Sequence, residues 1–510
     1  MQTDFEFSIN GDIHRGGGKP VEYSLLDYLR ENAMISGEDF PGRGTCGLCS
    51  VLLVDRDARQ GAVLRLVNAC EMKLPMVAGR AIWTVDGMPG EEETHSLQEA
   101  LTIAEQLSCN CSVGRCSMDS VGMHGNNVKK RMVRPLLPEE GSFFRVTGYL
   151  PFPSALKRLL QEQKDTSHAN FLSSVSDADL VPEFAYRDPS GNLFYRPVNL
   201  KGALRLLQAH PGAKIVAGDT LYPDAQQGPS PVTEPPQVVV SLQSVIQLRE
   251  VCLERGKWQI GGAVTIRSLS DALRGKIPLI ARMASRLGSL QVRNRATVGG
   301  NLAFAAHDSD LVPVLLALDA EVLISDLSGE RKLMLKDFLG GAARGALGRG
   351  GILKSVLLEC RESNASDQDC GNYLSGFYKV TRRNYNDRAI ICGAFVVEIN
   401  DEGRVTRSRL CYGGVSAHAM RAYAAEELLT GALWGPKVAG RVAIALREAF
   451  PAQSDHLAGA DYRQAMVSQL WRKFFAENRT PWTYVPVSHE PGYCVPSLET
   501  TQGVAEDVQR

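Results

Sequence analysis

The stretch Gln291-Val-Arg-Asn-Arg-Ala-Thr-Val-Gly-Gly-Asn301 gathers a hydroxyl residue, two adjacent glycines and an asparagine, and it is followed by Ser309-Asp310 and an apolar helical run from Val312. Adjacent glycines let a ligand or another backbone approach closely, because neither residue carries a Cβ atom. Thr297 and Asn301 offer hydrogen bonds to a diphosphate, and Asp310 offers a carboxylate to a ribityl or ribose hydroxyl. The stretch therefore predicts a loop that binds a nucleotide-like ligand.

A second glycine loop, Lys214-Ile-Val-Ala-Gly-Asp-Thr-Leu221, has the pattern of a strand that runs into Gly218 and a hydroxyl at Thr220. Such a turn directs backbone N–H groups at an anion, although a plain strand-end turn has the same sequence. Neither loop contains Gly-x-Gly-x-x-Gly, which disfavours a Rossmann dinucleotide site.

Hydrophobic periodicity around these loops predicts an α/β segment that begins at about residue 185. Its expected helices and strands cover 200–209, 213–217, 238–242, 278–287, 312–318 and 320–324. A further segment from about 373 to 478 carries a strand at 391–399 and closes with helices at 436–449 and 461–477.

The first ninety residues have the pattern of a small β-rich domain with one helix. Residues 5–9 alternate, Asn10-Gly11 is a hairpin turn signal, and residues 24–31 have helical spacing after a serine cap. Residues from about 95 to 165 are mostly helical in pattern, and 166–184 are polar and resemble a linker.

Composition limits the classes of protein to be considered. The chain has 510 residues, 44% of them hydrophobic, and 56 Lys+Arg balance 57 Asp+Glu to a net charge of −1. At roughly 150 residues per domain this length suggests about three domains, each able to bury a core. The neutral balance argues against nucleic acid or a membrane as partner. No export signal is visible, so we expect a cytoplasmic protein.

The cysteines are unevenly distributed. Six of the 12 lie between Cys46 and Cys116, a cluster that is typical of a metal or redox module. The remaining six are scattered, as core or surface thiols usually are. Twelve in so long a chain are too few for a disulfide scaffold.

Together these motifs resemble the FAD-binding domain of xanthine dehydrogenase and other molybdenum hydroxylases. The resemblance continues through Phe377-Tyr-Lys-Val-Thr-Arg-Arg383, Tyr412-Gly-Gly-Val-Ser-Ala417 and Asp461-Tyr-Arg463, and it covers nearly the whole chain. It implies a multidomain α+β fold with five parts. These are a ferredoxin-like β-grasp domain (1–90), a helical [2Fe–2S]-type domain (91–165), a two-part α/β FAD-binding domain of PCMH type (185–365), an α+β C-terminal subdomain (370–480) and an extended tail (481–510).

The resemblance also implies which residues contact the flavin. Carried over position by position, they are Ile215, Val216, Ala217, Gly218, Asp219, Thr220, Leu221, Tyr222, Leu287, Thr297, Gly300, Asn301, Asp310, Leu353 and Lys379. In family terms 215–222 and 297–301 cradle the diphosphate, whereas Leu353 and Lys379 approach the isoalloxazine ring. A cation near that ring favours reduced, anionic flavin. No catalytic residue is implied on this chain.

The iron–sulfur motifs depart from the family. Cys46, Cys49 and Cys70 fit three ligand positions of the β-domain [2Fe–2S] cluster, but Pro41 stands at the first. In the helical domain Cys116 is kept, and apolar residues replace the other three thiolates (Val113, Phe144 and Val146). We therefore expect no cluster in the helical domain, and in the β-domain either none or a labile one with three cysteine ligands. Zinc at the same three cysteines has no obvious fourth ligand.

The leading functional hypothesis is an FAD-binding electron-transfer subunit in a hetero-oligomer. A molybdopterin-containing large subunit would hydroxylate a purine, and this chain would pass the electrons to NAD. Two alternatives remain open, a non-catalytic structural paralogue of that subunit and a stand-alone FAD oxidoreductase. Because the molybdenum site would lie on the partner chain, this sequence does not identify the substrate.

Overall fold

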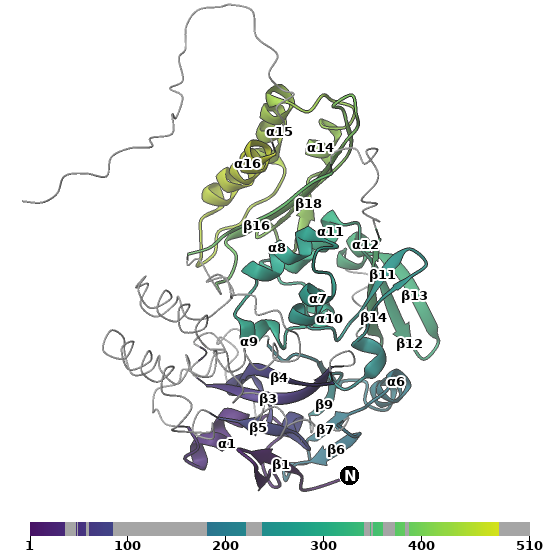
Figure 1. Cartoon of the computed structure of the whole chain (residues 1–510), viewed down its shortest axis with the longest axis vertical. Coiled ribbons are helices and arrows are strands. Elements are labelled where there is room, and N and C mark those ends of the chain that lie inside the picture. Colours follow the sequence, from purple (N-terminus) through teal and green to yellow (C-terminus); the bar gives the residue numbers. More distant parts are fainter. Residues whose placement is uncertain are drawn as a thin grey trace, which may run out of the picture.

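The computed structural model describes residues 1–35, 47, 49–57, 61–84, 181–220, 237–340, 347, 350–360, 373–382 and 387–478. The predicted helical domain (91–165) and tail (481–510) lie outside these residues, and the domain boundaries stay predictions. Figure 1 shows the N-terminal sheet at one end of the long axis, a body of helices and strands in the middle, and a sheet covered by two long helices at the other end.

The N-terminal sheet has the mixed strand order β2-β1-β5-β3-β4 of the expected β-grasp domain. Its strands are β1 (Glu6–Ile9), β2 (Asp12–Arg15), β3 (Ser50–Asp57), β4 (Gly61–Asn68) and β5 (Ala81–Trp83), and β1 runs parallel to β5. Helix α1 (Leu25–Glu31) begins at the predicted cap, since the Ser24 side chain accepts a hydrogen bond from the Asp27 backbone N–H. Asn10 and Gly11 have positive φ angles of 55° and 95°, which confirms the predicted tight turn.

A second, four-stranded sheet shares the hydrophobic core of this domain. Its order is β6-β7-β9-β8, from β6 (Phe184–Arg187), β7 (Leu193–Arg196), β8 (Lys214–Val216) and β9 (Val238–Ser241), and α6 (Leu200–Ala209) connects β7 to β8. The ring of Phe5 lies 5.5 Å from that of Phe184 and 5.1 Å from that of Tyr186. The N-terminal domain and the strand that carries the first glycine loop are thus packed against each other.

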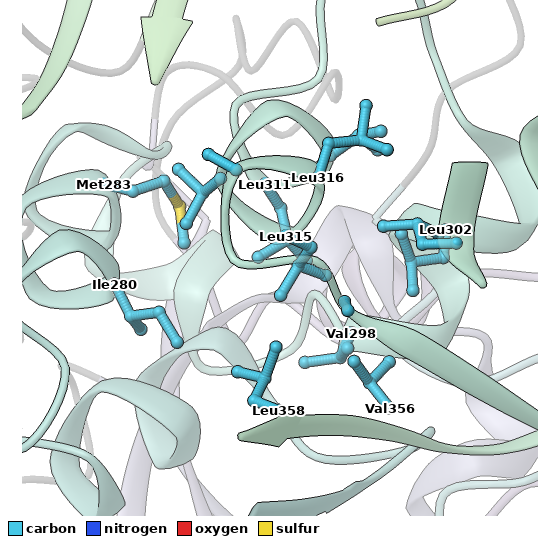
Figure 2. Close-up of a cluster of buried hydrophobic side chains, with 14 of the residues drawn as sticks. Ile280, Met283, Val298, Leu302, Leu311, Leu315, Leu316, Val356 and Leu358 are labelled. Carbon is cyan, nitrogen blue, oxygen red and sulfur yellow. The ribbon is translucent and has the colours of Figure 1, made fainter. Parts of the chain in front are cut away.

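The middle body is an antiparallel sheet covered by short helices. The sheet has the order β10-β11-β14-β12-β13, with strands Val251–Glu254, Lys257–Gly261, Ile352–Glu359, Glu321–Asp326 and Gly329–Met334 in that order. The helices are α7 (Ile266–Ala272), α8 (Pro278–Arg286), α9 (Leu290–Arg293), α10 (Val298–Phe304), α11 (Leu311–Ala317) and α12 (Leu335–Leu339). All seven residues of α11 are buried, as expected for a helix that is apolar all round. Figure 2 shows its leucines among side chains from α8, α10 and β14.

The C-terminal part is an antiparallel sheet, β15 (Tyr373–Val380), β16 (Ile391–Ile399), β17 (Val405–Gly413) and β18 (Met420–Arg421), with α14 (Tyr423–Glu427), α15 (Pro436–Glu448) and α16 (Ala460–Glu477). Its aromatic core includes Phe395, Tyr412, Trp471 and Phe474, and α8 and α11 contact the sheet as well. Because β16 is covered on both faces, its sequence is a continuous apolar run and does not alternate. In the part of the chain that the structure describes, no helix has both the length and the apolarity to cross a membrane.

Candidate functional site

The two predicted glycine loops lie against each other. The Nε atom of the buried Arg295 donates a hydrogen bond to the Gly218 carbonyl at 2.9 Å. A Cβ atom on Gly218 would lie 2.1 Å from the carbonyl oxygen of Arg295, closer than any real contact. Only glycine fits there, so the sequence signal at Gly218 has a packing cause as well as a proposed role in binding.

The two glycines of the second loop have different surroundings. The Gly299 N–H donates to the Gly262 carbonyl at 2.7 Å, and a Cβ on Gly299 would lie 2.6 Å from that same oxygen. A Cβ on Gly262 would in turn lie 2.2 Å from the carbonyl oxygen of Leu353. At Gly300, by contrast, the only described atom that a Cβ would meet within 4 Å is Oγ1 of Thr297, at 2.9 Å. Gly299 therefore serves close packing, and Gly300 borders open space.

Thr297 and Asn301 are held in fixed orientations. Thr297 caps α10, because its Oγ1 accepts the Gly300 N–H at 3.1 Å. Among the described residues, none accepts the Thr297 hydroxyl proton, which a ligand could therefore use. Ser309 Oγ accepts the Val312 N–H at 3.2 Å, so its proton is donated to Asn301 Oδ1, 2.6 Å away. This bond assigns the oxygen of the Asn301 amide and turns its NH2 end toward other partners.

Asp310 and Lys379 form a buried ion pair. Lys379 Nζ lies 2.6 Å from Asp310 Oδ2, and the side chains are only 3% and 7% exposed. Lys379 also donates to the Arg286 carbonyl at the end of α8, at 3.1 Å. Burial raises the pKa of Asp310, and the Lys379 ammonium opposes that rise. The second oxygen, Oδ1, is buried and has no hydrogen-bond partner among the described residues.

The remaining predicted contacts are distributed around these groups. Leu287, at the end of α8, and Leu353, on β14, are buried in the middle core. On β8 Val216 is buried and Ile215 is exposed, while Ala217 and Thr220 are half-buried on the loop that follows. Leu221 and Tyr222 lie outside the described residues.

These side chains fit an FAD molecule. The Thr297 hydroxyl and the Asn301 amide are hydrogen-bond donors of the kind that a diphosphate accepts, and the open side of Gly300 lies between them in sequence. The unpaired Asp310 oxygen is an acceptor for a sugar-chain hydroxyl, which would relieve the cost of leaving it buried and unbonded.

Two of the three predicted metal ligands are described. The carbonyl of the buried Cys49 accepts the Ala69 N–H at 2.9 Å, which brings it close to the half-buried Cys70. Cys46 lies outside the described residues. Within those residues no group of three or more His, Cys, Asp or Glu side chains could hold a metal ion.

Sequence reasoning missed two residues that contact the first glycine loop. Lys73 Nζ pairs with Asp219 Oδ2 at 2.7 Å, and Arg295 holds the Gly218 carbonyl. Burial works against the charge of Lys73, but Asp219 and Glu22 outweigh it and raise its pKa. The available signal was a lone lysine in the otherwise apolar run Met72-Lys-Leu-Pro-Met76, because a lysine is seldom buried without a partner.

Comparison with known proteins assigns the family. Residues 184–358 match the FAD binding domain in molybdopterin dehydrogenase, and residues 376–478 match the CO dehydrogenase flavoprotein C-terminal domain; together they cover more than half of the chain.

Individual relatives are more distant. Xanthine dehydrogenase of Emericella nidulans is 24% identical over 80% of this chain, which spans 34% of that protein. The nicotinate dehydrogenase FAD-subunit of Eubacterium barkeri is 28% identical over 47% of this chain and 79% of that protein. The solved carbon monoxide dehydrogenase of Hydrogenophaga pseudoflava is 23% identical over 55% of this chain and 94% of that chain, with a TM-score of 0.49. From its two family matches, the chain belongs to the FAD-binding flavoproteins of the molybdenum hydroxylase family.

Proposed function

We propose that this chain is the FAD subunit of a xanthine dehydrogenase-like molybdenum hydroxylase. It would accept electrons that originate at a molybdopterin-containing partner subunit and pass them to NAD. The observation that carries the proposal is the contact of Gly218 with Arg295, which directly precedes the segment of Thr297, Gly300 and Asn301. Asp310, at the start of α11, has one oxygen with no partner among the described residues.

The proposal gives this chain's residues distinct tasks. Thr297 and Asn301 would hold the diphosphate, and Asp310 would accept a hydrogen bond from the ribityl chain. Lys379 and Leu353 would approach the isoalloxazine ring. Bound FAD would supply the hydride and electron-transfer chemistry, and the protein would orient it. Because Asp310 offsets the charge of Lys379, we expect a weaker preference for anionic reduced flavin than a lone lysine would give.

The name of the Eubacterium barkeri relative, an FAD-subunit, supports a partner chain. The family's electron path from the partner chain gives weaker support, because it needs iron–sulfur clusters. Four positions where thiolates would ligate these clusters hold other residues, namely Pro41, Val113, Phe144 and Val146. The β-domain cluster is therefore proposed as absent or as a labile one on Cys46, Cys49 and Cys70.

The test is an absorption spectrum of the purified full-length chain with iron and acid-labile sulfide assays. Flavin bands at about one FAD per chain are expected, and a colourless protein that binds no added FAD would contradict the proposal. Bleaching of the flavin by NADH without oxygen tests the acceptor. Co-purification of a molybdopterin subunit separates the proposal from a stand-alone oxidoreductase.

A matched pair of variants tests the site itself. Thr297→Ala removes the hydroxyl and should weaken FAD binding by about tenfold, the loss typical of one hydrogen bond to a charged group. Thr297→Ser keeps the hydroxyl and the helix cap, so it should bind FAD as the wild type does. Equal FAD affinities in the two variants would show that the Thr297 hydroxyl does not bind FAD.

A further inference from the structure

Lys73 lies in the N-terminal domain, between the 3-10 turns Ala69–Glu71 and Leu74–Val77. The residues on both sides of it are hydrogen-bonded to the first residue of α1 and to the segment before it. The Leu25 N–H donates to the Met72 carbonyl, and the Leu74 N–H to the Tyr23 carbonyl, each at 2.8 Å. The position from which the Lys73 side chain starts is therefore fixed by backbone bonds.

The Lys73 side chain crosses to the proposed flavin loop. Its Nζ atom lies 2.7 Å from Asp219 Oδ2, 146 residues away in sequence, and the side chains are 11% and 14% exposed. A second carboxylate, that of Glu22, lies 2.8 Å away but is 46% exposed. Glu22 also faces Lys214 at 3.7 Å. The charges of these two lysines and two carboxylates sum to zero. Lys214 lies at the start of β8, and Asp219 lies just after its end.

Asp219 has a left-handed backbone conformation. Its φ angle is +53°, in the left-handed region that side chains other than those of Gly, Asn and Asp rarely adopt. A residue keeps such a conformation when contacts with neighbouring residues stabilise it. The neighbouring Gly218 is also held, since Arg295 donates to its carbonyl and reaches Met76 Sδ at 3.4 Å.

We propose that Lys73 is a positioning residue for FAD, which holds Gly218 and Asp219 after β8 in place and neutralises Asp219 beside the flavin diphosphate. The inference rests on the proposed function, because the diphosphate is assigned to this loop. It gives the N-terminal domain a task that needs no iron–sulfur cluster.

The electrostatic consequence has a definite sign. Without Lys73, Asp219 would present an uncompensated carboxylate to a ligand that is itself anionic, and burial keeps that repulsion poorly screened. Removing the Asp219 charge as well should relieve the repulsion. A merely structural role for Lys73 predicts that the free energy of unfolding, and not the FAD Kd of the folded protein, follows these substitutions.

The experiment measures FAD affinity of the full-length chain, stripped of flavin, by the quenching of flavin fluorescence on binding. We expect Lys73→Met to raise Kd about tenfold or more, because one partner of a largely buried pair is lost. Asp219→Asn should change Kd less than about threefold, and the double variant should return to that value.

Control variants separate charge from folding. Lys73→Arg keeps the charge and should retain most of the affinity. Lys257→Met removes the 2.7 Å pair with Glu321 on another sheet and should leave Kd unchanged. If Lys73→Met does not fold, the double variant Lys73→Gln/Asp219→Asn is measured in its place. An FAD Kd within about threefold of wild type supports the charge argument, and a Kd about tenfold higher overturns it.

Each remaining outcome is decisive. A Lys73→Met protein that binds FAD within about twofold of wild type overturns the inference but leaves the proposed function intact. A double variant as weak as Lys73→Met overturns the neutralising role. A wild type that binds no FAD overturns the proposed function, and this inference with it.

Discussion

Lys379 on β15 and Asp310 at the start of α11 are joined by an ion pair of 2.6 Å that is almost entirely buried. The pair ties the C-terminal sheet to the middle body at the proposed flavin site. The second carboxylate oxygen of Asp310, Oδ1, is buried and has no hydrogen-bond partner among the described residues.

Breaking this pair should be costly. Lys379→Met leaves a buried carboxylate uncompensated, and we expect a loss of about 3–5 kcal/mol in the free energy of unfolding, measured by urea denaturation. Lys257→Met is the matched control, because its pair with Glu321 is 35% and 18% exposed and should contribute less than about 1 kcal/mol. Equal losses in the two variants would show that burial does not set the strength of the Lys379 pair.

The two adjacent glycines should respond differently to alanine. Gly299→Ala drives a Cβ into the Gly262 carbonyl, and we expect it to destabilise the protein by about 1–3 kcal/mol. Gly300→Ala meets only the side-chain oxygen of Thr297, at 2.9 Å, so we expect it to cost less stability than Gly299→Ala while it weakens FAD binding. Thermal denaturation and FAD titration of both variants test this, and the reverse order of effects would contradict the assignment.

Ser309 should act on FAD through Asn301. Ser309→Ala removes the acceptor of the Val312 N–H and the donor to Asn301 Oδ1, which should cost about 0.5–2 kcal/mol of stability. The freed Asn301 amide should also raise the FAD Kd. Ser309→Thr keeps the hydroxyl and should restore both properties. If Ser309→Ala lowers stability without changing the Kd, Asn301 is not a flavin contact.

Acid should weaken one contact near the C-terminal sheet. Burial of Asp455 works to raise its pKa, but the N–H groups of Ala458 and Leu457 and the Arg463 guanidinium outweigh it and lower the pKa to about 2. Since the folded-state pKa is depressed, this contribution is present above the ordinary value of 3.8 and is lost as pH falls toward 2.

The measurement compares wild type with Asp455→Asn in urea at pH 6 and at pH 2.5. The wild type should be the more stable by about 1 kcal/mol at pH 6, a value reduced for solvent screening, and the difference should shrink at pH 2.5. A difference that does not change with pH would assign the effect of the substitution to packing.

The local elements followed from the sequence because their causes are local. The Ser24 cap, the helix Leu200–Ala209 and the strand Ile391–Ile399 are confirmed close to their predicted bounds. Periodicity and capping act within a few residues, so a short window of sequence contains the whole signal. The glycine loops were found for the same reason, since their composition alone indicates close backbone contact.

The contacts across the chain were decided only by tertiary structure. Lys73 meets Asp219 across 146 residues, and Lys379 meets Asp310 across 69. Nothing in either pair's own sequence names its partner, because a charge can be balanced by any opposite charge that folding brings near it. The sequence by itself determined the elements, the glycine loops and the shortage of cluster cysteines. Packing of the β-grasp domain, the middle body and the C-terminal sheet determined which charges meet at the loops, because burial makes an unpaired charge too costly to keep.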